Sequence, residues 1–314
     1  MRARSLPYPC ESLRPLVLGA ALFECSCGRV GFGAGPDTAM RDVGPSVADA
    51  ASLDAAVVPL AFGPSFDSVV AQTLVNTGVR EFGVAMSPDG LQIVFASYGT
   101  SAAEPMGSNL YFARRTRLDA LFSGRTLVTD ASTDQVEAEP VWAVRGTELY
   151  FDRGGDSGIR RCVVSGDACT GTVSVPDLET FGGADVSVGE RHLVLGRGGD
   201  LYEAVRASTT DPWPVPTRIE ELASAEVDGF PSLRGDGLEI FWERSGARSP
   251  SIWRAVRPRL DAPFGAPEPV TFAGLSGATG DPDIDESGRT LAFVAFPDGG
   301  SAEFDIYLAT RTPL

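Results

Sequence analysis

From about residue 60 onward, hydrophobic residues come in short runs that are separated by clusters of Gly, Pro, Asp and Ser. The stretch 228–270 shows the arrangement most clearly: a run ending at Leu233, a Gly-Asp-Gly turn, two further runs at 238–242 and 251–257, and a proline-rich tail. Such runs predict β-strands, and the Gly and Pro clusters predict the turns between them. No sustained helical period follows residue 80. We therefore expect a chain built almost wholly from short strands.

The same order of runs recurs five times. Second strands are expected at 91–95, 147–151, 192–195, 238–242 and 290–294, and third strands at 110–115, 201–206, 252–257 and 306–311. The third strands share one pattern: aliphatic, aromatic, any residue, Ala, any residue, Arg. Because side chains alternate along a strand, the aromatic residue, the Ala and the Arg share a face, and we expect the ring of Trp253 to be buried between neighbouring sheets. A repeating unit of this length predicts a propeller blade.

The fold class predicted for residues 59–314 is an all-β, five-bladed β-propeller of four-stranded antiparallel blades, or a six-bladed one if the N-terminal stretch holds additional strands. The fifth unit stops at 311–314 after its third strand, whereas 64–70 resembles an orphan fourth strand. The N-terminal strand is therefore expected to complete the last blade and to close the ring. Closure removes the exposed sheet edges that an open array would leave.

The N-terminal residues 1–27 have the features of a bacterial export signal. Three arginines accompany an apolar core at 16–23 that is too short to span a bilayer. The following Cys-Ser-Cys resembles a lipoprotein processing site with acylation at Cys27 or Cys25; an ordinary cleaved signal is the alternative. Residues 28–58 are too poor in large apolar residues to fold alone and predict a disordered tether. We expect an exported protein, either lipid-anchored to a bacterial membrane or periplasmic.

Charge and composition exclude several classes of function. The formal net charge of −16 argues against nucleic acid as a partner and against attraction to an anionic membrane surface, so membrane contact is expected only through a lipid anchor. All 26 basic residues are Arg, which excludes Schiff-base and lysine-nucleophile chemistry. His192 is the single histidine, so a zinc site with two or three histidines is excluded as well.

The Ser-Pro-Asp-Gly turn at 87–90, the Leu-Tyr-x-Ala-x-Arg strands and the Phe-Gly-x-Pro tails resemble the WD40-like repeats of TolB-type β-propellers. The resemblance covers roughly residues 60–314. It implies the propeller fold, a place in the bacterial envelope and a role as a binding scaffold. The second unit departs from the pattern at 159–162, and TolB's additional N-terminal domain has no counterpart in these repeats, so TolB's own partners are not carried over.

Two cysteines of the second unit predict a disulfide. A tight turn centred on Ser165-Gly166 would place Cys162 and Cys169 directly opposite each other on paired strands, within the distance that a disulfide requires. Oxidation is expected in an exported protein. A metal-binding or redox pair is the alternative.

Acidic residues gather where the units enter their inner strands: Glu81, Glu137, Glu139, Asp185, Asp228, Asp281 and Asp283. Inner strands line the channel of a propeller, so these residues are candidate binding residues at one channel mouth. They would suit Ca²⁺; no other metal or cofactor is predicted. Asp228 and Asp281 would alternatively serve as the carboxylate pair of a glycoside hydrolase. The competing explanation is turn capping and solubility, because Asp near a turn bonds its own backbone.

Five repeats without a catalytic motif favour a binding protein over an enzyme. We expect a monomeric, non-enzymatic scaffold that binds a protein or peptide of the cell envelope on one face of the ring. A carbohydrate-active hydrolase or a calcium-dependent glycan binder at the channel mouth is the alternative. A purely structural envelope protein is the third hypothesis.

Overall fold

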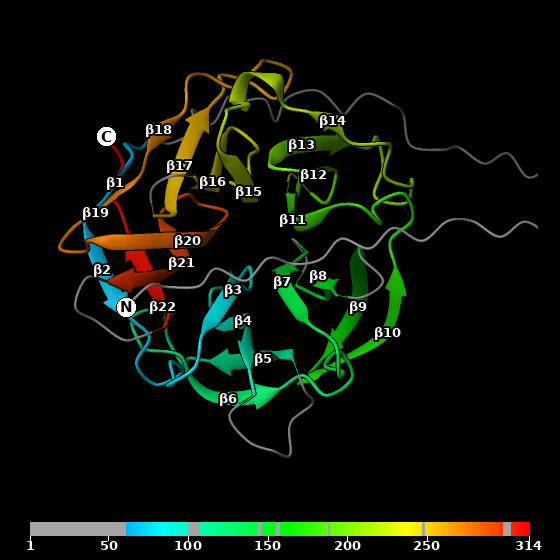
Figure 1. The fold of residues 1–314 in the computed structure, drawn as a ribbon, viewed down its shortest axis with the longest axis vertical. Coiled ribbons are helices and arrows are strands. Elements are labelled where there is room, and N and C mark those ends of the chain that lie inside the picture. The colour runs from blue at the N-terminus through cyan, green and yellow to red at the C-terminus, as the bar shows by residue number, and fades with distance from the viewer. Residues whose placement is uncertain are drawn as a thin grey trace, which may run out of the picture. The chain divides into compact units, whose positions relative to one another are not determined.

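Five four-stranded antiparallel sheets surround a central axis, with the first strand of each sheet innermost (Figure 1). The structure, a computed structural model, describes residues 61–99, 107–143, 146–154, 158–187, 189–246, 249–297 and 303–314. The five-bladed propeller predicted from the repeats is thereby confirmed. The export signal, the tether, Cys25 and Cys27 lie outside the described residues. Within the described part of the chain, no helix has the length and hydrophobicity needed to cross a membrane.

Blades 1 to 4 are meanders whose strands follow chain order from the axis outward. Blade 1 contains β3 (Glu81–Met86), β4 (Gln92–Tyr98), β5 (Ser108–Arg114) and β6 (Ser123–Leu127). Blade 2 contains β7 (Glu137–Trp142), β8 (Glu148–Arg153), β9 (Ile159–Ser165) and β10 (Ala168–Ser174). Blade 3 contains β11 (Gly182–Ser187), β12 (His192–Arg197), β13 (Asp200–Val205) and β14 (Thr217–Arg218), followed by a short 3₁₀ helix, η1 (Glu220–Leu222). Blade 4 contains β15 (Val227–Leu233), β16 (Glu239–Ser245), β17 (Ser251–Val256) and β18 (Glu268–Pro269).

Blade 5 joins the two ends of the propeller. It contains β20 (Gly277–Ile284), β21 (Thr290–Pro297), β22 (Asp305–Thr310) and, as its outer strand, the N-terminal β2 (Ser68–Ala71). Just before β2, β1 (Ser65–Phe66) pairs in parallel with β19 (Thr271–Phe272) between blades 4 and 5. Leu314 N–H donates to the Ala61 carbonyl at 2.9 Å. The predicted closure of the ring by the N-terminal strand is therefore confirmed.

All five inner strands break their pairing at the same level. Each carries a β-bulge, and the residue at the bulge has a positive φ of 47–56°. These residues are Gly83, Glu139, Gly183, Phe230 and Asp281. Glycine adopts this conformation without a steric cost, whereas the other three side chains are strained there. A Cβ on Gly83 would also lie 2.8 Å from the backbone nitrogen of Glu139, so the axis is closely packed at the bulge level.

An arginine at the end of the third strand ties four of the blades together internally. In these residues, Nε donates to a carbonyl of the turn between the first and second strands at 2.6–2.8 Å, and the guanidinium carbon lies 4.0–4.4 Å from the centre of a ring near the fourth strand. The arginine–ring pairs of this "arginine clamp" are Arg115–Phe122, Arg206–Trp213, Arg257–Phe264 and Arg311–Phe62. Because Phe62 precedes β2, the clamp of blade 5 includes the N-terminal segment.

Blade 2 replaces the arginine clamp with a disulfide. Val164 occupies the position of the clamp arginine. Its N–H donates to the Thr147 carbonyl, as the N–H of Arg115 donates to the Leu91 carbonyl in blade 1. Cys162 and Cys169 join the third and fourth strands, with Cα atoms 5.5 Å apart, which confirms the predicted disulfide.

The register predicted for the disulfide is wrong. The hairpin is centred one residue later than expected, on Gly166-Asp167, and Cys169 lies opposite Val164 instead of Cys162. A register shift between Thr170 and Val173 accompanies this diagonal arrangement.

The burial of Trp253 also differs from the expectation. Its ring is only half-buried, and Arg244 covers it at 4.5 Å, whereas Trp242 on the neighbouring strand is fully buried in a cluster with Ile240, Ala255 and Phe264. Both residues belong to the β16–β17 pair, where they lie opposite each other.

This pair gives a stability test with an internal control. Trp242→Ala is expected to lower the free energy of unfolding by about 3–5 kcal/mol, because it leaves a cavity in a packed core. Trp253→Ala is expected to lower it by about 1–2 kcal/mol, because that ring is already partly exposed to water. Denaturant unfolding of both variants measures the difference. Equal losses would contradict the difference in burial between the two rings.

Candidate functional site

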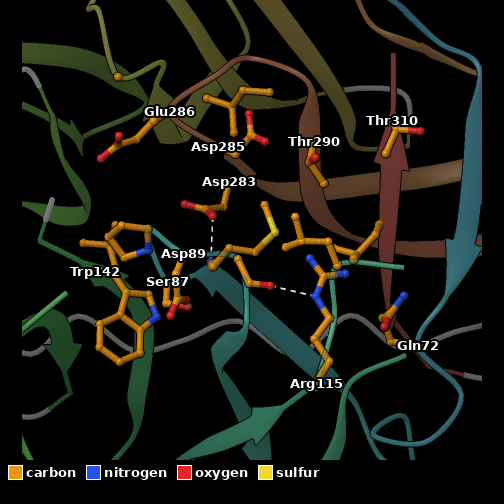
Figure 2. A pocket seen from close by; sticks show the side chains of 18 of the residues that line it. Gln72, Ser87, Asp89, Arg115, Trp142, Asp283, Asp285, Glu286, Thr290 and Thr310 are labelled. Atoms are coloured by element: carbon orange, nitrogen blue, oxygen red, sulfur yellow. Dashed lines mark hydrogen bonds between the residues drawn. The ribbon is translucent and has the colours of Figure 1, made fainter. Parts of the chain in front are cut away.

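A cavity of about 610 Å³ opens at one mouth of the channel and extends outward along the seam between blades 5 and 1. The carboxyl ends of inner strands, including Trp142 and Ser187, line its inner end, and Ser68, Leu118 and Thr310 line its outer end. We call this cavity the radial groove. Figure 2 shows its labelled side chains converging from the turns of several blades.

Carboxyl groups dominate the charged lining of the radial groove. Among the residues that the structure describes, six acids and one basic residue, Arg115, line it. The acids are Asp89, Asp119, Asp185, Asp283, Asp285 and Glu286. Arg115 is already engaged, because its Nε donates to the Gly90 carbonyl at 2.7 Å and its guanidinium covers Phe122. Asp119 is paired with Arg117 outside the cavity lining, whereas Asp89, Asp285 and Glu286 present negative charge to a ligand in the groove.

Two polar atoms in the inner wall of the radial groove have no hydrogen-bond partner among the described residues: Trp142 Nε1 and Ser187 Oγ. Both side chains are deeply buried, with exposed fractions of 5% for Trp142 and 3% for Ser187. A buried polar group without a partner costs about 1–3 kcal/mol. Such a group is uncommon in a native fold and marks a place where a partner would be favourable.

The acids predicted at one channel mouth lie at three separate levels of the inner strands. The first level contains Glu81, Glu137 and Asp228, which are fully buried and bind the loop just before their strand. Each is also paired with an arginine: Arg125, Arg153 and Arg244, respectively. Asp228 in addition accepts Trp242 Nε1–H at 2.8 Å. These contacts agree with turn capping and leave the three carboxylates engaged within the fold.

The second level is the bulge, where Glu139 and Asp281 lie with two acids from second strands, Asp152 and Glu243. Asp281 accepts the Gly83 N–H at 3.0 Å, and Asp152 accepts the Gly183 N–H at 3.0 Å. Each bond runs from one blade to the bulge of the next. Desolvation raises the pKa of Asp152 to about 7 and, together with the charge of Asp281, raises the pKa of Glu243 to about 7. Burial and the neighbouring carboxylates also hold the pKa of Glu139 well above its usual range.

The third level contains Asp185 and Asp283, which border the radial groove. Asp185 accepts the Leu233 N–H at 2.6 Å, and Asp283 accepts the Met86 N–H at 2.8 Å (Figure 2). Ser232 holds Ile284 of the next blade in the same way, at 3.0 Å. Desolvation raises the pKa of Asp185 to about 6 and that of Asp283 well above its ordinary value.

The central channel opens at two mouths, one near the first level and one near the third, and the bulge lies between them. At the bulge it holds a space of only about 30 Å³, about the volume of one water molecule. Asp281 lines this narrow space, whereas Asp228 and Glu243 line a different cavity of about 380 Å³ between blades 3 and 4. The structure therefore does not bring Asp228 and Asp281, the two acids of the alternative catalytic hypothesis, into one cavity.

No group of three or more His, Cys, Asp or Glu side chains is arranged to hold a metal ion in the part of the chain that the structure describes. The calcium site stays a prediction. The sequence pattern does not single out Asp152, Glu243, Trp142 or Ser187, because their roles depend on contacts between blades. The signal that was available is the proline after Glu139, Phe230 and Asp281, which marks the bulge in three units.

Comparison with known proteins shows the fold alone. No protein-family model and no curated protein matches the chain. An α-L-arabinofuranosidase from Podospora anserina, solved with cellotriose, is similar with a TM-score of 0.56 and 13% identity over 81% of this chain and 98% of that chain. An endo-arabinase from Bacteroides thetaiotaomicron has a TM-score of 0.52 and 13% identity over 79% of this chain and 99% of that chain.

The TolB resemblance is distant in structure as well as in sequence. TolB from Acinetobacter baumannii has a TM-score of 0.47 and 13% identity over 76% of this chain, and the match spans 57% of TolB. The chain thus has a β-propeller fold that is distantly similar to TolB propellers and to five-bladed glycoside hydrolases.

The buried carboxyl groups of the bulge predict how stability depends on pH. Because the folded pKa values of Asp152 and Glu243 are raised to about 7, the folded state binds protons that the unfolded state releases near pH 4. The free energy of unfolding should therefore fall as the pH rises from about 4.5 to 7.5. Asp152→Asn should reduce this fall by up to about 4 kcal/mol, since burial raises the pKa of Asp152 from 3.8 to about 7 and one pKa unit corresponds to about 1.4 kcal/mol.

Denaturant unfolding at a series of pH values measures the effect. Glu179→Gln is the control, because that side chain is exposed and its removal should leave the pH profile unchanged. A profile of Asp152→Asn that coincides with that of the wild type would show that this carboxyl is ionised in the fold.

Proposed function

We propose that this propeller is a binding protein that holds an extended segment of a partner protein or peptide in the radial groove. The observation that carries the proposal is the groove itself. Its volume of about 610 Å³ lies in the range of ligand sites, about 300–1,000 Å³, and it leads from the channel mouth to the rim. An open, elongated cleft suits a chain that enters and leaves at both ends more than a compact metabolite.

The lining supports a segment of mixed character. Leu118, Leu308 and Val70 supply apolar surface along the seam. The turns at 87–90 and 285–288 contribute polar side chains from two blades, and Gly235 of a third blade lies beside them. Extended peptides bind by combining main-chain hydrogen bonds with pockets for alternate side chains. The narrow channel below keeps the segment on this one face of the ring.

A groove-filling variant tests the proposal. Thr290 is half-exposed in the radial groove, and Thr290→Trp would occupy the space with a residue that strands accept. Peptides selected from a random dodecapeptide display library on the full-length chain should bind Thr290→Trp at least about tenfold more weakly, a loss of about 1.4 kcal/mol. Fluorescence anisotropy measures the affinities.

The matched control is Thr170→Trp, an exposed strand position in β10 outside the groove. It should bind the selected peptides as the wild type does, and both variants should keep the wild-type melting temperature. Peptides that bind both variants equally would place the binding surface elsewhere, and a selection that enriches no peptide would count against the proposal.

A second candidate function, a glycoside hydrolase, is favoured by the carboxyl group of Glu243. Its pKa near 7 suits a general acid at neutral pH, and it borders the cavity of about 380 Å³ on the opposite mouth. An α-L-arabinofuranosidase and an endo-arabinase are among the solved structures of similar fold. The competing explanation is that Glu243, like the other carboxyl groups at the bulge, serves only the structure of the fold.

The hydrolase candidate predicts release of p-nitrophenol from p-nitrophenyl α-L-arabinofuranoside. Glu243→Gln should reduce the rate by about 10²-fold or more, the usual contribution of a general acid, whereas Glu179→Gln should not. A wild-type protein that shows no release above buffer would eliminate this candidate and leave the groove proposal intact.

A further inference from the structure

The charge of the radial groove restricts what it can hold. Six acidic residues and one arginine line it, a larger acidic excess than the 42 acidic and 26 basic residues of the whole chain. The one guanidinium is held by the Gly90 carbonyl and the ring of Phe122. An anionic ligand would therefore meet carboxylates without a free cation to pair with, and like charges repel.

Glu286 is the most available of these acids. Its side chain is exposed at the rim of the groove and has no hydrogen bond or ion pair among the described residues. Its neighbour Asp285 caps its own turn, where Oδ1 accepts the Arg289 N–H at 2.8 Å. The two acids lie together at one side of the cavity, and Asp89 lines the same cavity from blade 1 (Figure 2).

The unpartnered atoms of the inner wall add a second requirement. Trp142 Nε1 is a donor only, so it needs an acceptor, and Ser187 Oγ accepts or donates. A polyamine or an isolated guanidinium supplies donors alone and would leave the indole N–H unpaired. A peptide carries both features, because its main-chain carbonyls accept and its Lys or Arg side chains are cationic.

We infer that the segment held in the radial groove is basic, with a Lys or Arg side chain among Asp89, Asp285 and Glu286 and a main-chain carbonyl on Trp142 Nε1. This inference rests on the proposed peptide-binding function and names the class of peptide. The indole nitrogen of Trp142 is shielded from solvent, so a ligand carbonyl that reaches it must move the ring. Binding should therefore change the fluorescence of Trp142.

Three fluorescein-labelled nonapeptide pools test the inference with the full-length chain. The pools share random uncharged residues and differ at two central positions, which hold Arg, Gln or Glu. The Arg pool should bind at least about tenfold more tightly than the Gln pool, and the Glu pool should bind most weakly. The preference for Arg should shrink as the salt concentration rises, because salt screens exposed charges. Fluorescence anisotropy measures each affinity.

Two variants separate charge recognition from the unpaired donor. The double variant Asp285→Asn and Glu286→Gln should bring the affinities of the Arg and Gln pools within about threefold of each other. The control is the double variant Glu179→Gln and Glu226→Gln, which makes the same charge change at exposed positions outside the groove. It should keep the preference for the Arg pool. Trp142→Phe should weaken the Arg pool by about five- to tenfold, since it deletes an N–H that has no partner among the described residues. Because Trp142 packs on Phe112 in the core, the variant should also melt at a lower temperature, and its binding is measured well below that temperature. It should also abolish the ligand-induced fluorescence change.

Each contrary result has a distinct meaning. Arg and Gln pools that bind equally, and that both lose affinity in Thr290→Trp, would overturn the basic preference but keep the groove as a peptide site. If no pool binds, both this inference and the proposed function fail. Spermine and the unlabelled Arg pool are each used to displace the labelled Arg pool. If both displace it at the same concentration, charge alone is recognised and the peptide assignment is overturned.

Discussion

The propeller depends on how it satisfies the backbone N–H groups around its axis. Every inner strand bulges at the same level, and the bulge leaves N–H groups without partners in their own sheet. Carboxylates from the preceding blade accept several of them: Asp281 bonds Gly83, Asp152 bonds Gly183, and Asp283 bonds Met86. A few directed bonds therefore set the rotation of one blade relative to the next. The fold itself uses the acids that the sequence suggests as ligand-binding groups, and their burial raises the pKa values of Asp281 and Asp283.

Most of the fold could be predicted from the sequence repeats. The Leu-Tyr-x-Ala-x-Arg pattern located the third strands, and the missing fourth strand of the last unit indicated how the ring closes. The site was less accessible to this reasoning, because its properties arise between units. Glu81 and Asp281 are both acids of inner strands, yet Glu81 caps a loop whereas Asp281 bonds the bulge of the next blade, and these contacts depend on the register of neighbouring strands. Trp142 is notable for a bond that it lacks, and no local pattern records a missing partner.

The narrow axis makes the two faces of the ring separate surfaces. A space of about 30 Å³ at the bulge admits no ligand segment, so whatever occupies the radial groove does not reach Glu243 on the other side. The two candidate functions therefore concern different mouths, and evidence for one is not evidence against the other. Five-bladed relatives in structure are glycoside hydrolases, but at 13% identity their chemistry is a hypothesis for one face of this chain and carries no implication for the groove.

Ring closure also imposes an order in time. The outer strand of blade 5, β2, pairs with β22, and the clamp of that blade needs both Phe62 and Arg311. The two partners are synthesised at opposite ends of the repeat region, so β2 leaves the ribosome long before any strand can accept it. Blades 1 to 4 each contain all of their own strands and can form as the chain grows, as domains generally do during synthesis. The fifth blade forms last, and until then β2 is an unpaired strand that a chaperone or a second chain could occupy.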